Sequence, residues 1–277
     1  RRSYQDPLGT YATNVLGTAH LLEAAGRCPT VRVVVAVTSD KCYENREGQG
    51  GYRETDLLGG ADPYSSSKAC AELVAAAWRR SFFAPDASPA GPVLATVRAG
   101  NVIGGGDWAP DRIIPDCVRA LADGRELYLR YPAAIRPWQF VLEPLRGYLE
   151  VAERCYPTDR SYGEAWNFGP RAADARPVSW LVERFSALTG GRLRFRVDAG
   201  QHPHEAGYLA LDCSKAAERL SWYPALDAEQ ALRWTAAWYE ACLGGADMAQ
   251  VTLRQLGEYE EALGPAPWLP GPERGRR

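Results

Sequence analysis

The sequence has one methionine, Met248, and three histidines among its 277 residues, and it begins at Arg1. Its longest apolar stretch, 31–37, is interrupted by Arg32 and falls far short of the roughly 20 residues that a membrane-spanning helix needs. No signal-peptide pattern opens the chain, and no long basic run precedes its terminal arginines. Lys and Arg number 32 against 34 Asp and Glu, a net charge of -2. We therefore expect no membrane segment and no nucleic-acid partner.

The spacing of the cysteines and histidines argues against a disulfide framework and against a metal site. The seven cysteines are an odd number, are widely scattered and include no C-x-x-C pair. Reduced thiols in a cytoplasmic protein are the simplest interpretation. His202 and His204 have no second pair of ligands nearby in the sequence, so we predict no metal site.

The composition and the element pattern predict an α/β fold. Apolar residues make up 46% of the chain and charged residues 24%, as in a globular protein with a packed core. The first hundred residues alternate between helix and strand patterns, at Asp6–Gly26, 31–37, 63–82 and 93–99. Such alternation predicts βαβ units and a Rossmann-like, doubly wound parallel sheet.

The pattern is more mixed beyond residue 106. Short strands are predicted at 127–130, 136–141, 165–168 and 192–197. Helices are predicted at 111–122, 143–156, 178–188, 214–220 and 228–243. The segment 264–277 is rich in proline, glycine and arginine, which predicts a disordered tail.

Tyr64 and Lys68 are four residues apart, which places a phenol and an ammonium on one face of the predicted helix. The lysine charge is expected to lower the pKa of the tyrosine, so that the phenol can exchange a proton with a sugar or alcohol oxygen. A solvated pair on a helix surface gives the same spacing. The polar run 38–41 supports the functional interpretation, because it follows a buried strand, and ligands bind at the carboxyl ends of strands in open α/β sheets.

These motifs, in this order, resemble the extended short-chain dehydrogenase/reductases that act on nucleotide sugars. The shared features are N-x-x-G-T on a helix (14–18), a valine strand ending in a Ser/Thr-Asp cluster, Y-x-x-x-K, and a strand ending in R-x-x-N (98–101). Longer runs are similar to the CDP-glucose 4,6-dehydratase group of that family, at 38–45, 62–68, 98–108, 134–139, 166–170 and 203–206. The resemblance extends to about residue 243.

The resemblance implies NAD-dependent dehydration of CDP-D-glucose to CDP-4-dehydro-6-deoxy-D-glucose. The C4 hydroxyl is oxidised, water is eliminated across C5 and C6, and the hydride returns to C6. Tyr64 is then expected to be the base at C4, with Lys68 tuning it and holding the nicotinamide ribose, and Ser39 to hydrogen-bond the C4 oxygen. Asp40 is expected to protonate the departing C6 hydroxyl, so burial should raise its pKa.

Lys41 stands where related dTDP-sugar dehydratases carry a glutamate that removes the C5 proton. A lysine can remove that proton only when it is neutral, which desolvation and nearby positive charge favour. It can instead stay charged and stabilise the enolate formed from the 4-ketone. The sequence leaves both roles open.

Other residues are expected from the resemblance to contact ligands. Beside NAD, in addition to Tyr64 and Lys68, we expect Thr13, Thr38 and Val102. Arg136 is expected to pair with the diphosphate of the CDP-sugar, as guanidinium geometry favours, and Asn101 to reach the sugar and diphosphate. The weaker substrate-site candidates are Asn167, His204 and Tyr208.

One feature of the family is absent from the sequence, the G-x-x-G-x-x-G turn that binds the dinucleotide diphosphate. We therefore expect a preceding segment of roughly 85–90 residues by family comparison. Residues 1–102 are then the remaining part of the NAD-binding Rossmann domain. Residues 103–263 are mainly the nucleotide-sugar-binding domain, with returning Rossmann segments near 135–170. The full-length protein is expected to be a homodimer.

Two alternatives remain open. One is another nucleotide-sugar 4,6-dehydratase or a 4-epimerase, although Asp40 and Lys41 favour dehydration because they supply the acid and base that moving water requires. The other is a truncated, non-catalytic chain that binds a sugar nucleotide. If only these residues exist, we expect poor NAD binding and exposed apolar edges at 31–37 and 93–97.

Overall fold

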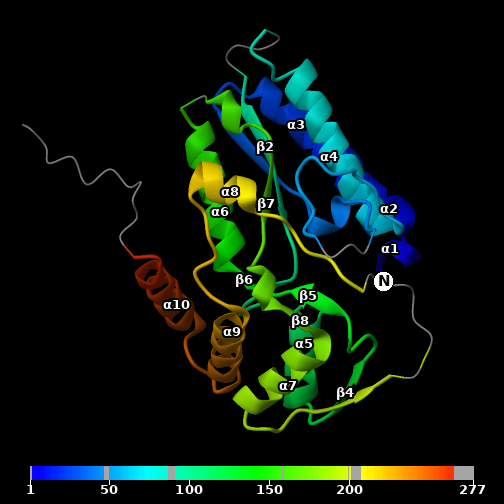
Figure 1. Cartoon of the computed structure of the whole chain (residues 1–277), viewed down its shortest axis with the longest axis vertical. Coiled ribbons are helices and arrows are strands. Elements are labelled where there is room, and N and C mark those ends of the chain that lie inside the picture. The colour runs from blue at the N-terminus through cyan, green and yellow to red at the C-terminus, as the bar shows by residue number, and fades with distance from the viewer. Residues whose placement is uncertain are drawn as a thin grey trace, which may run out of the picture.

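The computed structural model describes residues 2–46, 50–86, 91–157, 159–198, 200 and 207–264. The chain forms an upper lobe, in which a parallel sheet lies between helices, and a lower lobe of short strand pairs and helices (Figure 1). In the part of the chain so described, no helix is both long and apolar enough to cross a membrane.

The sheet of the upper lobe has the strand order β1-β2-β7, with neighbouring strands parallel. Its strands are β1 (Val33–Val37), β2 (Val93–Ala99) and β7 (Ala165–Phe168). Alternate residues of β2 face opposite sides, since Ala95 and Val97 belong to one core and Leu94 to another. A strand buried on both faces shows this alternation. Because β2 lies between β1 and β7, the expectation that 93–97 forms an exposed edge is wrong.

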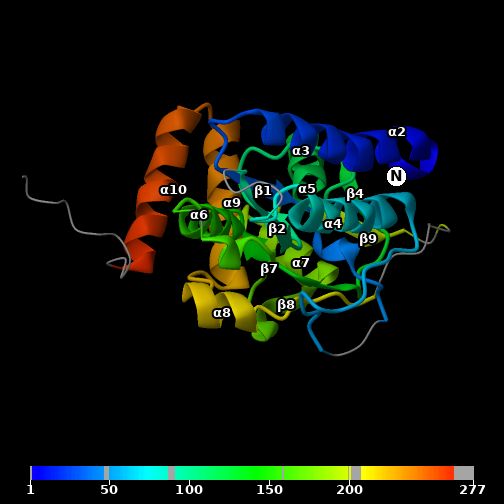
Figure 2. The same cartoon turned by 90° about the horizontal axis from the view of Figure 1, so that it is seen from above.

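Helices cover both faces of this sheet (Figure 2). On one face lie α3 (Gly17–Arg27) and α4 (Pro63–Ser81), and on the other lie α6 (Leu142–Cys155) and α8 (Ser214–Leu220). The chain passes from β1 through α4 to β2, and from β2 through α6 to β7. These crossovers confirm the predicted α/β class with a doubly wound parallel sheet.

The helix predicted from Asp6 is present as a series of helical segments. They are α1 (Arg2–Gln5), α2 (Pro7–Tyr11), the π-helical η1 (Ala12–Leu16) and α3. The Asp6 carboxylate caps α2 by accepting a hydrogen bond of 2.9 Å from Gly9 N–H. The Asn14 amide donates to the Ser67 hydroxyl at 2.9 Å, which joins η1 to the first turns of α4.

The lower lobe packs strand pairs and helices around a second core. The pairs are β3 (Val102–Ile103) with β6 (Gln139–Phe140), β4 (Glu126–Leu129) with β9 (Arg194–Val197), and β5 (Ile135–Pro137) with β8 (Ala175–Pro177). The helices are α5 (Ile113–Ala122), α7 (Val178–Leu188) and α9 (Ala228–Leu243). The single strand predicted at 136–141 is two strands, because the chain changes its pairing partner at Trp138. Short 3-10 turns lie at η2 (Asp40–Cys42), η3 (Arg160–Tyr162) and η4 (Ala172–Asp174).

A helix that the sequence patterns do not predict, α10 (Met248–Leu263), follows α9 and packs against it. It begins after Asp247, whose carboxylate accepts a hydrogen bond of 3.0 Å from Ala249 N–H. Its buried residues are Val251, Gln255 and Tyr259. The polar Gln255 in this stripe weakens the apolar periodicity. Of the predicted tail at 264–277, residues 265–277 lie outside the described residues.

Candidate functional site

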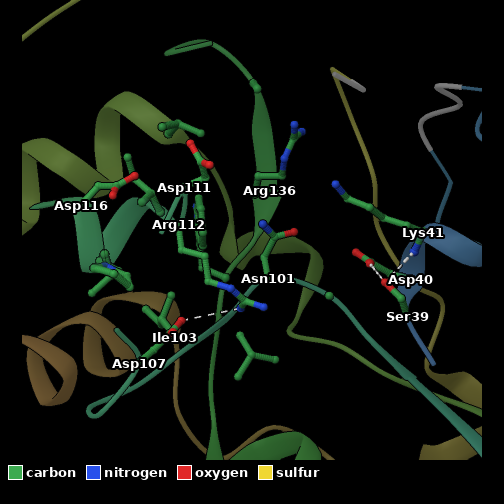
Figure 3. A pocket seen from close by; sticks show the side chains of 18 of the residues that line it. Ser39, Asp40, Lys41, Asn101, Ile103, Asp107, Asp111, Arg112, Asp116 and Arg136 are labelled. Atoms are coloured by element: carbon green, nitrogen blue, oxygen red, sulfur yellow. Dashed lines mark hydrogen bonds and ion pairs between the residues drawn. The ribbon is translucent and has the colours of Figure 1, made fainter. Parts of the chain in front are cut away.

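A cavity of about 560 Å³ lies between the two lobes, at the carboxyl ends of β1 and β2 (Figure 3). The upper lobe contributes the segments that follow these strands and the start of α4. The lower lobe contributes the approach to α5 and the strands β4 and β5. The lining residues that were predicted as site residues are Thr38, Ser39, Asp40, Lys41, Tyr64, Asn101, Val102 and Arg136. The fold thus gathers residues that are almost a hundred positions apart in the sequence.

Asp40 is the most buried ionisable group at this cavity, with 3% of its surface exposed. The Ser39 hydroxyl donates to Asp40 Oδ1 at 3.0 Å and accepts from Lys41 N–H at 3.2 Å, which fixes the turn η2. Oδ2 has no hydrogen-bond partner among the described residues. A Cβ atom at Gly100 would lie 2.2 Å from Oδ2, so glycine is needed there.

Burial raises the pKa of the Asp40 carboxyl above its ordinary value, against the opposing effects of the Lys41 charge and the Ser39 hydrogen bond. This is the direction expected from the sequence. The carboxyl group can therefore carry a proton at a pH where an exposed aspartate is ionised, and a proton donor needs that property.

Tyr64 lies in the first turn of α4, where Pro63 and the cap Asp62 fix the start of the helix. The Asp62 carboxylate accepts hydrogen bonds from the N–H groups of Tyr64 and Ser65 at 2.9 and 3.0 Å. Burial of the phenol raises the pKa of Tyr64, although a hydrogen bond with Ser39 opposes this. The expectation of a lowered pKa is therefore wrong, because burial outweighs the nearby groups that favour the phenolate.

Lys68 does not line the cavity, but it contacts Val37, which does. Its ammonium donates to the Val37 carbonyl at 3.5 Å and lies 6.0 Å from the centre of the Tyr64 ring. Burial lowers the pKa of Lys68. The lysine thus joins the end of β1 to the helix that carries Tyr64.

A buried ion pair between Glu72 and Arg98 was missed by the sequence analysis. Glu72 lies one turn after Lys68, and Arg98 near the end of β2; their contact between Oε2 and Nη2 is 2.8 Å, with both side chains at most 3% exposed. The Thr38 hydroxyl also donates to Glu72, at 2.5 Å. Burial alone would raise the pKa of Glu72, but the Arg98 guanidinium holds it below its ordinary value. This pair fixes α4 against β1 and β2.

Arg136, Asn101 and Lys41 surround the same part of the cavity (Figure 3). Arg136 on β5 is 6% exposed, and its Nη1 donates to the Ile135 carbonyl at 2.9 Å. Asn101 has a positive φ of 26°, a conformation uncommon for residues other than glycine, and it turns the chain at the end of β2. A buried guanidinium next to a side-chain amide suits an anionic, hydroxyl-bearing ligand.

The structure places the remaining predicted residues away from the cavity lining. Asn167 is fully buried, where its amide donates to the carbonyls of Tyr52 and Asp212 and accepts from the Tyr43 hydroxyl at 2.7 Å. Its polar atoms therefore join loops of the upper lobe. Tyr208 forms a bridge with Ile135 next to Arg136, and Thr13 is exposed on η1. His204 lies outside the described residues.

Among the lining residues that were not predicted, Arg112 and Tyr148 carry polar groups. Arg112, just before α5, forms a 3.7 Å ion pair with Asp107. Its positive charge also acts on Tyr64, where it favours the phenolate. Tyr148 on α6 contributes a phenol, which packs edge-on against Phe168 with 5.7 Å between ring centres. The run 107–112 directly follows three consecutive glycines, Gly104 to Gly106, after the predicted R-x-x-N strand motif, and this continuity was the available sign for Arg112.

Comparison with known proteins gives concordant matches. Residues 1–235 match the family described as GDP-mannose 4,6 dehydratase. A CDP-glucose 4,6-dehydratase of Salmonella typhimurium is 49% identical over 263 residues, which are 95% of this chain and 73% of the relative. A dTDP-glucose 4,6-dehydratase of Streptomyces griseus is 30% identical, over 86% of this chain and 67% of the relative.

Solved structures of related enzymes share the fold. A dTDP-glucose 4,6-dehydratase from Bacillus anthracis in complex with NAD has a TM-score of 0.66 and 26% identity, over 83% of this chain and 68% of that one. One from Streptomyces venezuelae with NAD bound has a TM-score of 0.70 and 26% identity, over 89% of this chain and 71% of that one.

Proposed function

Because the chain belongs to the GDP-mannose 4,6 dehydratase family, we propose that it is an NAD-dependent hydro-lyase that converts CDP-D-glucose to CDP-4-dehydro-6-deoxy-D-glucose. The 49% identity with a CDP-glucose 4,6-dehydratase supports this substrate over other sugar nucleotides. The observation that carries the dehydration step is the buried Asp40 beside a cavity that Tyr64 also lines: its pKa is raised, and one of its oxygens has no partner within the described part of the chain.

The residues at the ends of β1 and β2 are proposed to hold the nicotinamide part of NAD, because Tyr64 and Val102 line the cavity there and Lys68 contacts the lining residue Val37. The proposed cofactor contacts are Thr13, Thr38, Tyr64, Lys68 and Val102. When bound, NAD accepts a hydride from the sugar and returns it. The glycine turn for the dinucleotide phosphates is not in the sequence.

The chain's own residues move the protons of the proposed reaction. Tyr64 removes the proton of the C4 hydroxyl, while Ser39 hydrogen-bonds the C4 oxygen. Asp40 gives its proton to the departing C6 hydroxyl, so that water leaves and the carboxyl becomes ionised. The Ser39 hydroxyl donates to Asp40 Oδ1 in this structure, and because it has a single proton it must turn from that carboxyl to donate to the C4 oxygen.

Lys41 is proposed to act in the same elimination. It lines the cavity next to Asp40, and its side chain is exposed there. The lysine either removes the C5 proton as a neutral amine or, when charged, stabilises the enolate that forms as this proton leaves. Both roles require the lysine for elimination but not for substrate binding.

Binding of the CDP-sugar is assigned to two polar residues that lie near Lys41 at the cavity. Arg136 pairs with the diphosphate and Asn101 hydrogen-bonds the sugar, because these groups lie at the junction of the lobes. His204 and Tyr208 remain weaker candidates, whereas the buried Asn167 amide is bonded to protein groups. The proposed domain division follows the same assignment: residues 1–102 and the returning segments near 135–170 serve the cofactor, and the rest of 103–263 serves the nucleotide sugar.

A cytoplasmic homodimer is also proposed. Apolar side chains stand exposed on the helices of one face of the sheet, Leu8 at 82%, Leu21 at 61% and Leu73 at 57%. A helix pair that includes α4 can cover such residues against a second copy. Sedimentation of the protein at increasing concentration tests this association, and a monomer at all concentrations excludes it.

The activity is tested by incubating the protein with NAD and CDP-D-glucose, dTDP-glucose or UDP-glucose in parallel. Mass spectrometry is expected to show loss of one water from the CDP sugar in preference to the others. A product of unchanged mass and inverted C4 configuration would indicate a 4-epimerase. Binding of CDP-glucose without any conversion would indicate a non-catalytic chain.

A further inference from the structure

Gly104, Gly105 and Gly106 follow β3, and each glycine is required for a different reason. A Cβ atom at Gly104 would lie 2.7 Å from Val141, and one at Gly105 would lie 2.1 Å from the indole of Trp238 on α9. Gly106 has a positive φ of 83°. The loop therefore lies directly on the Trp238 ring.

The next residue of the same helix holds the other end of this loop. Tyr239 is 1% exposed, and its hydroxyl donates to the carbonyl of Asp107 at 2.6 Å. Its ring packs edge-on against Trp108 and against Trp238, with 5.3 Å between ring centres in each pair. Consecutive aromatic residues of α9 thus contact the loop at successive positions.

The loop 104–108 continues into residues that line one side of the cavity. Gly104, Asp107 and Arg112 are lining residues, and Asp107 Oδ2 lies 3.7 Å from Nη1 of Arg112. Figure 3 shows Asp107 and Arg112 across the cavity from Asp40 and Lys41. A shift of the Asp107 backbone would therefore move Arg112 relative to the groups on the opposite side.

The helix α10, beside α9 in Figure 1, fixes the indole in turn. Trp238 Nε1 donates to the Thr252 hydroxyl at 2.9 Å, and that hydroxyl donates to the Met248 carbonyl at 2.7 Å. Trp238 is 9% exposed between the loop and α10. Contacts therefore run from α10 through Trp238 to the loop.

We propose that Trp238 and Tyr239 are positioning residues for the substrate: by holding the loop 104–108 they set Arg112 and the adjoining wall to receive the nucleotide sugar. This inference rests on the proposed function, since it takes a nucleotide sugar as the ligand of the cavity. Neither residue lines the cavity, so both act through the loop.

The test is calorimetric titration of CDP-glucose into the protein and into Tyr239→Phe. Loss of the hydrogen bond to Asp107 is expected to weaken binding by about 2- to 10-fold. Tyr259→Phe is the matched control, because it also removes a buried tyrosine hydroxyl, one that donates to Glu143 at 2.8 Å away from the cavity. The control is expected to lose stability in urea while the dissociation constant of CDP-glucose stays within about 2-fold.

Equal dissociation constants for the wild-type protein and Tyr239→Phe would overturn the inference and leave the proposed function standing. Equal weakening in both variants would also overturn it, because the effect would then be general destabilisation. If the wild-type protein itself does not bind CDP-glucose, the proposed function fails, and the inference fails with it.

Discussion

The Ser39 hydroxyl donates a 3.0 Å hydrogen bond to Oδ1 of Asp40, a carboxyl whose other oxygen has no partner among the described residues. One oxygen is thus held, and the other is buried beside Gly100 without a partner among the described residues. Since burial raises the pKa of this carboxyl, that second oxygen can carry the proton. This geometry fits a proton donor better than an ion-pairing group.

Asp40→Asn is expected to lower the rate of water loss by about 100- to 10,000-fold, because an amide of the same shape cannot donate an acidic proton. Asp174→Asn is the matched control: Asp174 is also buried with one oxygen that has no partner among the residues described, but its other oxygen accepts a hydrogen bond of 2.9 Å from Ala228 N–H at the start of α9. Mass spectrometry of the product measures both rates. Equal rates in the two variants would show that Asp40 does not donate the proton in the reaction.

The raised pKa of Asp40 also makes stability depend on pH. A carboxyl with a pKa higher in the folded than in the unfolded state binds more protons when folded, so its ionisation destabilises the fold as pH rises above the unfolded value near 3.8. Asp40→Asn removes this effect. Urea unfolding between about pH 4 and 7 should show Asp40→Asn gaining stability relative to wild type as pH rises. A constant difference would contradict the raised pKa.

Lys41→Met is expected to bind CDP-glucose normally and to lose water elimination, because the lysine acts only on the C5 proton or the enolate. Lys215→Met is a control, since the Lys215 ammonium pairs with Glu164 at 2.6 Å, away from the cavity. Titration calorimetry gives the affinity and mass spectrometry the elimination. Normal elimination in Lys41→Met would show that Lys41 is a surface lysine that takes no part in the reaction.

Glu72→Gln is expected to destabilise the protein by about 3–5 kcal/mol, because it leaves the buried Arg98 charge without its partner. Glu229→Gln, which breaks the exposed pair with Arg184, should cost less than about 1 kcal/mol. Urea unfolding measures both values. Similar values for the two variants would show that the buried pair does not fix α4 against the sheet.

The sequence predicted the elements whose pattern is local. The strands 93–99 and 165–168 and the helices 178–188, 214–220 and 228–243 have the predicted bounds, because buried strands give apolar runs and amphipathic helices a clear period. The helix α10 was missed, since its buried stripe includes Gln255. The break between β5 and β6 at Trp138 was not predicted. The two strands pair with different partners, and the sequence of 136–141 alone does not show which strand each part will pair with.

The site was predictable where its residues follow strand ends, as Asp40 and Asn101 do. The burial that raises the pKa of Tyr64 was not predictable, because it depends on the packing of both lobes. Asn167 looked like a ligand contact in its motif. Its partners Tyr43 and Tyr52 lie more than a hundred residues away, so its structural role could not be read from the local sequence.

The most direct test of the proposed dehydration is conversion of CDP-D-glucose with NAD in deuterium oxide, followed by NMR of the product. Elimination removes the C5 hydrogen as a proton, and the hydride then returns to C6. The product should therefore be the 4-keto-6-deoxy sugar with one solvent deuterium at C5. A dehydrated product with no deuterium at C5, or no dehydrated product at all, would contradict the proposed reaction.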